Sequence, residues 1–210
     1  MHEPAARAAV PWRRRWHDLK WRLREKYVAR YTFVHINKTG GSSIESALGL
    51  PFRHMTAREM QALVGPQRWQ RRFTFTVVRN PWAKVVSHYG YRLKRDKLCR
   101  DGDRLGFADW VRLAYGQNDP RYYDVPKMFM PQVDWITDDH GAMLVDFVGR
   151  FEDLEGSFAE ICRRLGVVAT LPHLKRTDHG PYQEYYTPEA RGIVARWFAR
   201  DIEQFGYGFG

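Results

Sequence analysis

Eight residues, Ile36–Ser43 (INKTGGSS), restrict the local fold of this chain more than any other segment. They follow the apolar run Tyr31–Ile36, which is typical of a buried parallel strand, and they lead into Ser43–Leu48, which can start a helix. A strand, a glycine turn and a helix in this order direct free backbone N–H groups and a helix N-terminus at an anion. The segment therefore predicts a phosphate-binding loop, with an ordinary glycine turn as the alternative.

The residue types in this loop suit a phosphate. Gly40 and Gly41 carry no Cβ, so the backbone can approach phosphate oxygens. Ser42 and Ser43 add hydroxyl donors, and Lys38 adds a positive charge. In loops that bind ATP or GTP the lysine follows the last glycine, as in G-x-x-x-x-G-K-[ST]. Here the lysine precedes the glycines, and the chain contains no Gly-Lys dipeptide, so an NTPase or a small-molecule kinase is a disfavoured alternative.

Strands and helices alternate along the rest of the chain. Phe73–Val78 and Val145–Phe151 are predicted strands, because β-branched and aromatic residues dominate them. Capping residues predict helices after Thr56, after Asn80-Pro81, over Leu154–Leu165 and after Thr187. A further short helix is expected over 107–115. This order predicts an α/β fold, a three-layer sandwich with a central, mostly parallel sheet, in which ligands bind beyond the carboxyl ends of the strands. We expect one domain over 31–210 and a basic, amphipathic extension over 1–30.

A second motif, VVRNPWAKVVSHYGY, begins at the end of the Phe73–Val78 strand. Arg79 lies at the strand tip, and Ser87 follows eight residues later, two turns into the next helix. The guanidinium and the hydroxyl group could together bind a second phosphate. The alternative is a helix-capping Arg-Asn-Pro turn with a buried serine.

Together the two motifs resemble those of the PAPS-dependent sulfotransferases, most closely the carbohydrate branch of the heparan sulfate 2-O- and chondroitin type. The first loop of that branch reads like PKTGGTS, and the second reads like VRNPWDRLVSAY. GRFEDLEGSF, LPHL and the C-terminal YYTPEARGIVARWFARDIEQFGYGF also look like this branch, so the resemblance covers roughly 31–210. Asn37 stands where the family has proline, which leaves the backbone and Lys38 contacts available.

The resemblance implies a P-loop-like nucleotide-binding core and a sulfuryl donor, 3′-phosphoadenosine 5′-phosphosulfate (PAPS). Lys38 and the backbone of Thr39–Ser43 would hold its 5′-phosphosulfate. Arg79 and Ser87 would hold its 3′-phosphate. The loop after LPHL, in which Lys175, Arg176 and Thr177 follow one another, would lie near the same 3′-phosphate. The family chemistry requires no metal, and Asp138-Asp139-His140 is interpreted as a solvated turn.

A sulfotransferase also needs a base for the acceptor hydroxyl, and Lys38 would neutralise charge on the leaving oxygen. In the saccharide branch a base histidine lies between the two phosphate motifs, and His54 occupies that place, 25 residues before Arg79. A surface loop histidine is the alternative. His35 is interpreted as buried and structural, His88 as pointing away from Ser87, and Glu45 as the alternative carboxylate base.

The net charge of +10 favours anionic partners, although a solvated basic surface explains it equally well. Residues 12–30 place five apolar side chains on one helical stripe: Trp12, Trp16, Leu19, Leu23 and Tyr27. We expect this stripe to pack on the domain itself, with contact to a membrane or to nucleic acid as the alternative. Such contact is also the basis of a rival function, a non-catalytic binding module.

The acceptor itself cannot be read from the sequence, beyond a hydroxyl group of a saccharide, glycolipid or related metabolite, and not of a nucleic acid. Residues 98–135 and Tyr182–Tyr186 are the expected acceptor-facing segments. No apolar run is long enough for a signal core or a transmembrane helix. We therefore expect a cytoplasmic protein, with membrane association through residues 12–30 as the open alternative. Cys99 and Cys162 permit at most one disulfide.

Overall fold

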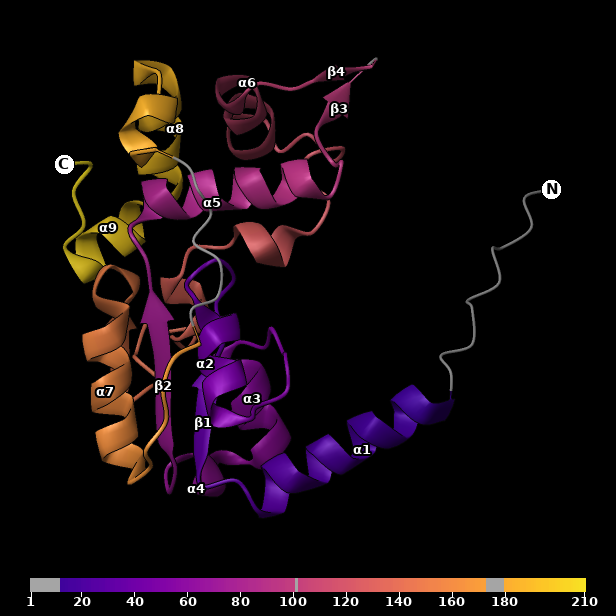
Figure 1. Ribbon diagram of the computed structural model, residues 1–210, viewed down its shortest axis with the longest axis vertical. Helices are drawn as coiled ribbons and strands as arrows, with labels where there is room; N and C mark the ends of the chain where they lie inside the picture. Colours follow the sequence, from indigo (N-terminus) through magenta and orange to yellow (C-terminus); the bar gives the residue numbers. More distant parts are fainter. Residues whose placement is uncertain (1–11, 101, 173–179) are drawn as a thin grey trace.

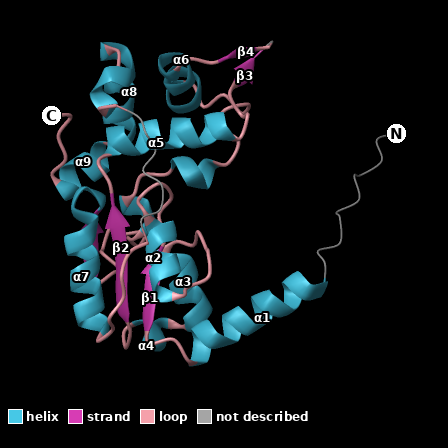
Figure 2. Ribbon diagram, in the orientation of Figure 1, coloured by secondary structure: helices cyan, strands magenta, loops and turns pink. Residues whose placement is uncertain are grey.

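The structure, a computed structural model, describes residues 12–100, 102–172 and 180–210, with backbone only for 12–17 and 100. Its centre is a three-stranded parallel sheet in the order β1-β2-β5, with β1 Tyr31–Val34, β2 Phe73–Val78 and β5 Phe147–Arg150. Tyr31 is in register with Phe73, and Phe75 with Phe147. The three predicted strands are confirmed, the second with its predicted bounds. Figure 2 shows β1 and β2 side by side and running in the same direction.

Side chains alternate between the two faces of the sheet. Phe75 and Val77 of β2 pack with α2 (Gly41–Leu48) and α7 (Leu154–Leu165). Val78 of β2 and Val34 of β1 pack on the opposite face, with α3 (Ala57–Val64) and η3 (Val133–Trp135). Both faces are therefore buried, which agrees with the near-continuous apolar sequences of β1 and β2 and with the expected α/β layers.

A group of helices lies beyond the carboxyl ends of the strands (Figure 1). It contains α5 (Pro81–Lys94), α6 (Phe107–Val111), its π-helical continuation η1 (Arg112–Gly116) and α8 (Pro188–Trp197). Trp110, Phe129 and Phe198 are completely buried in its core. The remaining elements are the short α4 (Pro66–Trp69), β3 (Cys99–Arg100), β4 (Asp103–Arg104), η2 (Pro126–Phe129), η4 (Phe151–Asp153), η5 (Tyr182–Tyr185) and α9 (Ala199–Phe205).

The helices begin where the capping residues predict. The Asn80 side chain accepts from the backbone N–H of Trp82 and of Ala83 at 3.1 and 3.3 Å, which fixes the first turn of α5. Thr56 and Glu59 form the predicted capping box of α3. The C-terminal helix differs from the prediction, because Phe198, with φ −105° and ψ 25°, separates α8 from α9.

Helix α1 (Trp12–Tyr27) corrects one interpretation of the sequence. Leu19, Leu23 and Tyr27 of the predicted stripe are 47%, 49% and 61% exposed, so they do not pack on the domain. Trp21 and Glu25 on the opposite side of the helix face the protein instead. The expectation for that stripe was therefore wrong; the side chains of Trp12 and Trp16 lie outside the described ones. Among the described residues, no helix is both long and apolar enough to span a bilayer, and Cys99 and Cys162 are free thiols.

Candidate functional site

Two parallel strands, β1 and β2, end at the same edge of the sheet and direct both sequence motifs to it. The loop from His35 to Gly40 follows β1, and Arg79 follows β2. Phe151 follows β5 at the same edge. In parallel sheets this edge is the usual place for a ligand, and α5 begins there at Pro81.

The loop after β1 leaves a row of backbone donors unused. Within the described part of the chain, no protein acceptor takes the backbone N–H groups from Lys38 to Ser42, whereas the Ser43 N–H donates to the Gly40 carbonyl at 3.0 Å. Lys38 and Gly40 have positive φ angles of 67° and 82°, which turn successive N–H groups to one side. Consecutive donors at a helix N-terminus form an anion-binding site.

The side chains of the loop divide into anchors and free groups. The Thr39 hydroxyl donates to the Ile36 carbonyl at 2.9 Å and Thr39 is completely buried, so only its backbone is available to a ligand. The Asn37 amide donates to the Met128 carbonyl at 2.9 Å and thereby holds η2 against the loop. Ser42 is exposed and Ser43 half-buried, so both hydroxyl groups can reach a ligand.

Both glycines are required by the protein itself. A Cβ at Gly40 would lie 3.0 Å from Leu154 and from Phe151, in a backbone conformation that disfavours other residues. A Cβ at Gly41 would lie 2.1 Å from Cδ2 of His35. The imidazole of His35 therefore occupies the space that a side chain at position 41 would need.

Lys38 is held in a cationic environment. Its Nζ lies 4.9 Å from the centre of the Tyr91 ring. Burial, and then the charges of Arg79 and Lys94, lower the pKa of Lys38 to about 8. The lysine is therefore charged at pH 7 but loses its proton far more easily than a lysine in water.

Arg79 connects the two motifs. Its guanidinium stacks 4.0 Å above the Phe151 ring and donates from Nη1 to the Lys38 carbonyl at 3.3 Å. The buried Nε has no hydrogen-bond partner among the described residues. Burial lowers the pKa of Arg79 to about 10, so the side chain remains charged at neutral pH. A buried guanidinium with an unused donor fits an anionic ligand.

Gln132 fixes the backbone at Arg79. Its side-chain oxygen accepts from the Arg79 N–H at 2.9 Å, and its amide donates to the Arg79 carbonyl at 2.8 Å. Gln132 is itself held by Asp201, whose carboxylate accepts from the Gln132 and Val133 N–H groups at 2.8 and 2.9 Å. Arg79 therefore enters the site from a rigid backbone.

Helix α5 carries the rest of the second motif. Ser87 is buried, and His88 beside it packs among Trp110 and Phe129, with Nδ1 3.4 Å from the Tyr115 hydroxyl. His88 is thus a core residue. Lys84, one turn earlier, is also buried, and its pKa is lowered to about 8, first by burial.

His54 has a defined tautomer. Its Nδ1 lies 2.9 Å from the His35 carbonyl, which can only accept, so Nδ1 carries the proton and Nε2 keeps its lone pair. Burial lowers the pKa of His54, which keeps the ring neutral at pH 7. Its ring centre lies 4.3 Å from that of His35 and 4.8 Å from that of Phe52. A neutral imidazole with a free Nε2 can accept a proton.

His35 links the glycine loop to His54. Its Nδ1 lies 2.8 Å from Oε1 of Glu45, and both residues are buried. The same Glu45 oxygen accepts from the Arg53 N–H at 3.1 Å, next to His54. His35 is thus buried, as expected, and Oε1 of Glu45 is engaged with His35 and Arg53.

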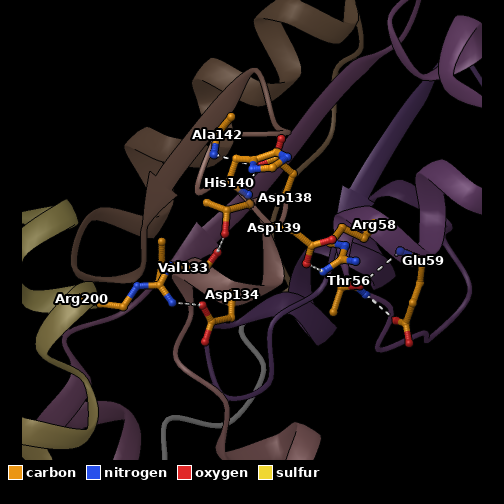
Figure 3. Close-up of polar contacts among 11 residues, drawn as sticks. Thr56, Arg58, Glu59, Val133, Asp134, Asp138, Asp139, His140, Ala142 and Arg200 are labelled. Atoms are coloured by element: carbon orange, nitrogen blue, oxygen red, sulfur yellow. Dashed lines mark hydrogen bonds and ion pairs between the residues drawn. The ribbon is translucent and has the colours of Figure 1, made fainter.

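Three of the predicted site residues, Lys175, Arg176 and Thr177, lie outside the described residues. Among the described ones, no group of three or more His, Cys, Asp or Glu side chains is placed to hold a metal. The Asp138 carboxylate accepts from the N–H groups of His140 and Ala142, and Asp139 pairs with Arg58 (Figure 3). The Asp-Asp-His segment is therefore an exposed turn held by its own backbone.

Three contributors were missed by sequence reasoning. Gln132 gives no local signal, because its partner lies 53 residues away. Phe151 is part of the GRFEDLEGSF segment and follows a predicted strand, so its place at the sheet edge was a usable signal. Tyr91 belongs to the second motif, one turn after Ser87, and helix periodicity places it on the same side.

The model of the sulfotransferase family matches residues 30–208. An uncharacterized protein of Archaeoglobus fulgidus is 29% identical over 116 residues, which are 54% of this chain and 83% of that protein. No solved structure matches this chain significantly.

Proposed function

Because this chain belongs to the sulfotransferase family, we propose that it transfers the sulfuryl group of PAPS to an acceptor hydroxyl of a saccharide, glycolipid or related metabolite. The observation that carries the donor assignment is the row of unused N–H groups from Lys38 to Ser42, together with the unused Nε of Arg79 at the same edge of the sheet. Two separate groups of anion donors at one sheet edge suit a nucleotide with phosphates at both ends.

The residues divide between the two ends of the donor. The loop N–H groups, Lys38 and the hydroxyls of Ser42 and Ser43 would hold the 5′-phosphosulfate, and Arg79 with Ser87 the 3′-phosphate. Lys175, Arg176 and Thr177 stay predicted contacts of the 3′-phosphate. PAPS supplies the sulfuryl group and leaves as adenosine 3′,5′-bisphosphate. The chain's own task is then orientation and charge stabilisation, as in phosphoryl transfer.

Proton removal is assigned to His54. Its Nδ1–H is fixed by the His35 carbonyl, so Nε2 is the atom that would take the acceptor proton. Lys38, charged at pH 7, would stabilise negative charge on the leaving oxygen. The exposed ring of Phe52, beside His54, is a candidate contact for an acceptor.

The donor assignment is tested by binding. Adenosine 3′,5′-bisphosphate should raise the melting temperature of the protein and ATP should raise it less, because ATP places no phosphate on the 3′ position. Arg79→Lys should weaken binding of the bisphosphate, since a lysine cannot reproduce the planar donor set. Arg112→Lys, an exposed arginine paired with Asp109, is the matched control. Equal stabilisation by ATP would contradict the assignment and revive the kinase alternative.

The reaction is tested by transfer of labelled sulfate from PAPS to a panel of glycans, glycolipids and phenols. His54→Ala should lower kcat by about 10²–10⁴-fold, the range for loss of a general base, and leave binding of the bisphosphate unchanged. His140→Ala, in an exposed turn, is the control. Full activity of the His54→Ala protein would overturn the base assignment without affecting the donor assignment.

A further inference from the structure

The outward side of α1 carries an apolar stripe that the domain does not cover. Leu19, Leu23 and Tyr27, here called the outer stripe, are spaced four residues apart, so at about 100° per residue they fall within an arc of about 80°. Each is about half exposed or more. Figure 1 shows α1 reaching away from the sheet, with its N-terminal half beyond the body of the protein.

The inner side of α1 fixes the direction of the outer stripe. Trp21 packs against the core that contains Met60 and Trp69. Glu25 is buried, with its carboxylate 3.5 Å from Arg72, which also donates to the Glu25 carbonyl. Rotating the stripe inward would expose the tryptophan and break this buried ion pair. The helix therefore presents the outer stripe in one fixed orientation.

Basic residues flank the outer stripe on both sides. At about 100° per residue, Arg22 and Lys26 fall on one side of it and Lys20 and Arg24 on the other. The only two acidic side chains between residues 18 and 27 point elsewhere. Asp18 pairs with Arg22 and with Arg53, at 3.6 and 2.6 Å, and Glu25 is buried.

Tyr27 and its neighbours extend this surface onto α4. The guanidinium of Arg68 lies 5.1 Å from the centre of the Tyr27 ring. Tyr27 is 61% exposed, and Nζ of Lys26 lies 5.7 Å from the centre of the same ring. An aromatic ring with a polar tip, surrounded by cations, suits the boundary between lipid headgroups and acyl chains.

We propose that the outer stripe binds the surface of a lipid bilayer that contains anionic headgroups. Leu19, Leu23 and Tyr27 would enter the headgroup–acyl boundary, and the flanking lysines and arginines would contact the headgroups. This inference is independent of sulfuryl transfer. A nucleic acid would leave the two leucines without a partner. A second copy of the chain, stripe against stripe, would bring two sets of like charges together.

The test uses the full chain and sedimentation with vesicles. Vesicles of phosphatidylcholine with about 30 mol% phosphatidylserine should bind the protein, and salt should weaken this binding. Vesicles of phosphatidylcholine alone should bind the protein at least about tenfold more weakly. The triple variant Leu19→Gln/Leu23→Gln/Tyr27→Gln should bind at least about tenfold more weakly than wild type. Val125→Gln/Val168→Gln, exposed valines elsewhere, is the matched control and should bind as wild type does.

Three outcomes would overturn the proposal. The first is equal binding of the triple variant and wild type to the anionic vesicles. The second is a dimer of the wild-type protein in sedimentation velocity and a monomer of the triple variant, because the stripe would then be an interface between two copies. The third is a fall of several degrees in the melting temperature of the triple variant, which would show that the stripe is covered within the chain. Binding of adenosine 3′,5′-bisphosphate should be the same in all variants.

Discussion

Replacing Gly41 by alanine tests the close contact between Gly41 and the imidazole ring of His35. Gly41 is the first residue of α2, and a Cβ there would lie 2.1, 2.3 and 2.7 Å from Cδ2, Nε2 and Cγ of His35. The His35 ring cannot move aside easily. Glu45 holds its Nδ1 at 2.8 Å, and the rings of Phe33 and His54 pack at 5.5 and 4.3 Å between centres.

Two opposing effects set the change in the free energy of unfolding that Gly41→Ala causes. Glycine to alanine inside a helix usually stabilises a protein by up to about 1 kcal/mol. Overpacking a rigid core usually costs about 1–3 kcal/mol, and here the overlap involves three ring atoms. We expect overpacking to exceed the helical gain, and subtracting a gain of about 1 kcal/mol leaves a net loss of up to about 2 kcal/mol. For a chain of 210 residues this lowers the melting temperature by up to about 8 °C.

The measurement is the free energy of unfolding in urea, with the melting temperature as a second readout. Gly90→Ala is the matched control, because Gly90 also lies in a helix and a Cβ there would meet no atom within 4 Å. That variant should be more stable than wild type by about 0.5–1 kcal/mol. The two alanine substitutions should therefore change stability in opposite directions.

A double-mutant cycle identifies the cause. In a His35→Ala background the ring is absent, so Gly41→Ala should cost much less than it does in wild type. If Gly41→Ala costs the same in both backgrounds, or stabilises the protein as Gly90→Ala does, the overlap with His35 is not what requires glycine, and the explanation given for this position is wrong.

Three further predictions concern pH and the acceptor. Because the pKa of Lys38 is about 8, the affinity for adenosine 3′,5′-bisphosphate should fall by up to about tenfold per pH unit above pH 8. Lys38→Arg should remove this pH dependence. Calorimetric titration of both proteins at several pH values measures the affinities. Burial lowers the pKa of His88 well below 6.5. As pH falls below about 6.5 the unfolded chain therefore binds a proton that the folded chain does not. The free energy of unfolding, measured in urea, should therefore fall by up to about 1.4 kcal/mol for each pH unit below about 6.5. In His88→Asn this fall per pH unit should be smaller. If it is the same as in wild type, His88 does not cause the pH dependence. Phe52→Ala should raise KM for the acceptor severalfold and Phe52→Tyr should not, with nucleotide binding unchanged in both; an unaltered KM would exclude Phe52 from the acceptor site.

Local rules were sufficient for much of the fold. The bounds of β2 and α7, the capping box at Thr56 and the N-cap at Asn80 depend on residues within a few positions of one another, so the sequence contains the complete signal. Parallel strands then bring Lys38 and Arg79 to the same edge, because their carboxyl ends coincide. The sequence is therefore sufficient to predict that both motifs lie at one edge of the sheet.

Contacts between residues far apart in the sequence determine which face of a helix packs on the protein and which positions need glycine, and local sequence patterns do not predict these contacts. The periodicity of α1 predicts an apolar stripe, but the face that packs is the one with Trp21 and Glu25, because Arg72 and the core around Met60 lie there. Likewise Gly41 looked like a residue needed only for phosphate approach, whereas the ring of His35 also fills the space beside it. Neither partner is close enough in the chain for periodicity or capping to reveal it.

Three cations at and near the candidate site have lowered pKa values, which suits the binding of an anion. Burial lowers the pKa of Lys38, Arg79 and Lys84, and Arg79 further lowers that of both lysines. Lowered values for three cations mean that the protein alone does not compensate their charge fully. Glu152 offsets this effect only in part at Arg79, and Asp201 only in part at Lys84, so the buried cations cost free energy. An anion at the unused N–H groups would remove that cost and raise the pKa of Lys38, so binding of a bisphosphate near pH 8 should be accompanied by proton uptake.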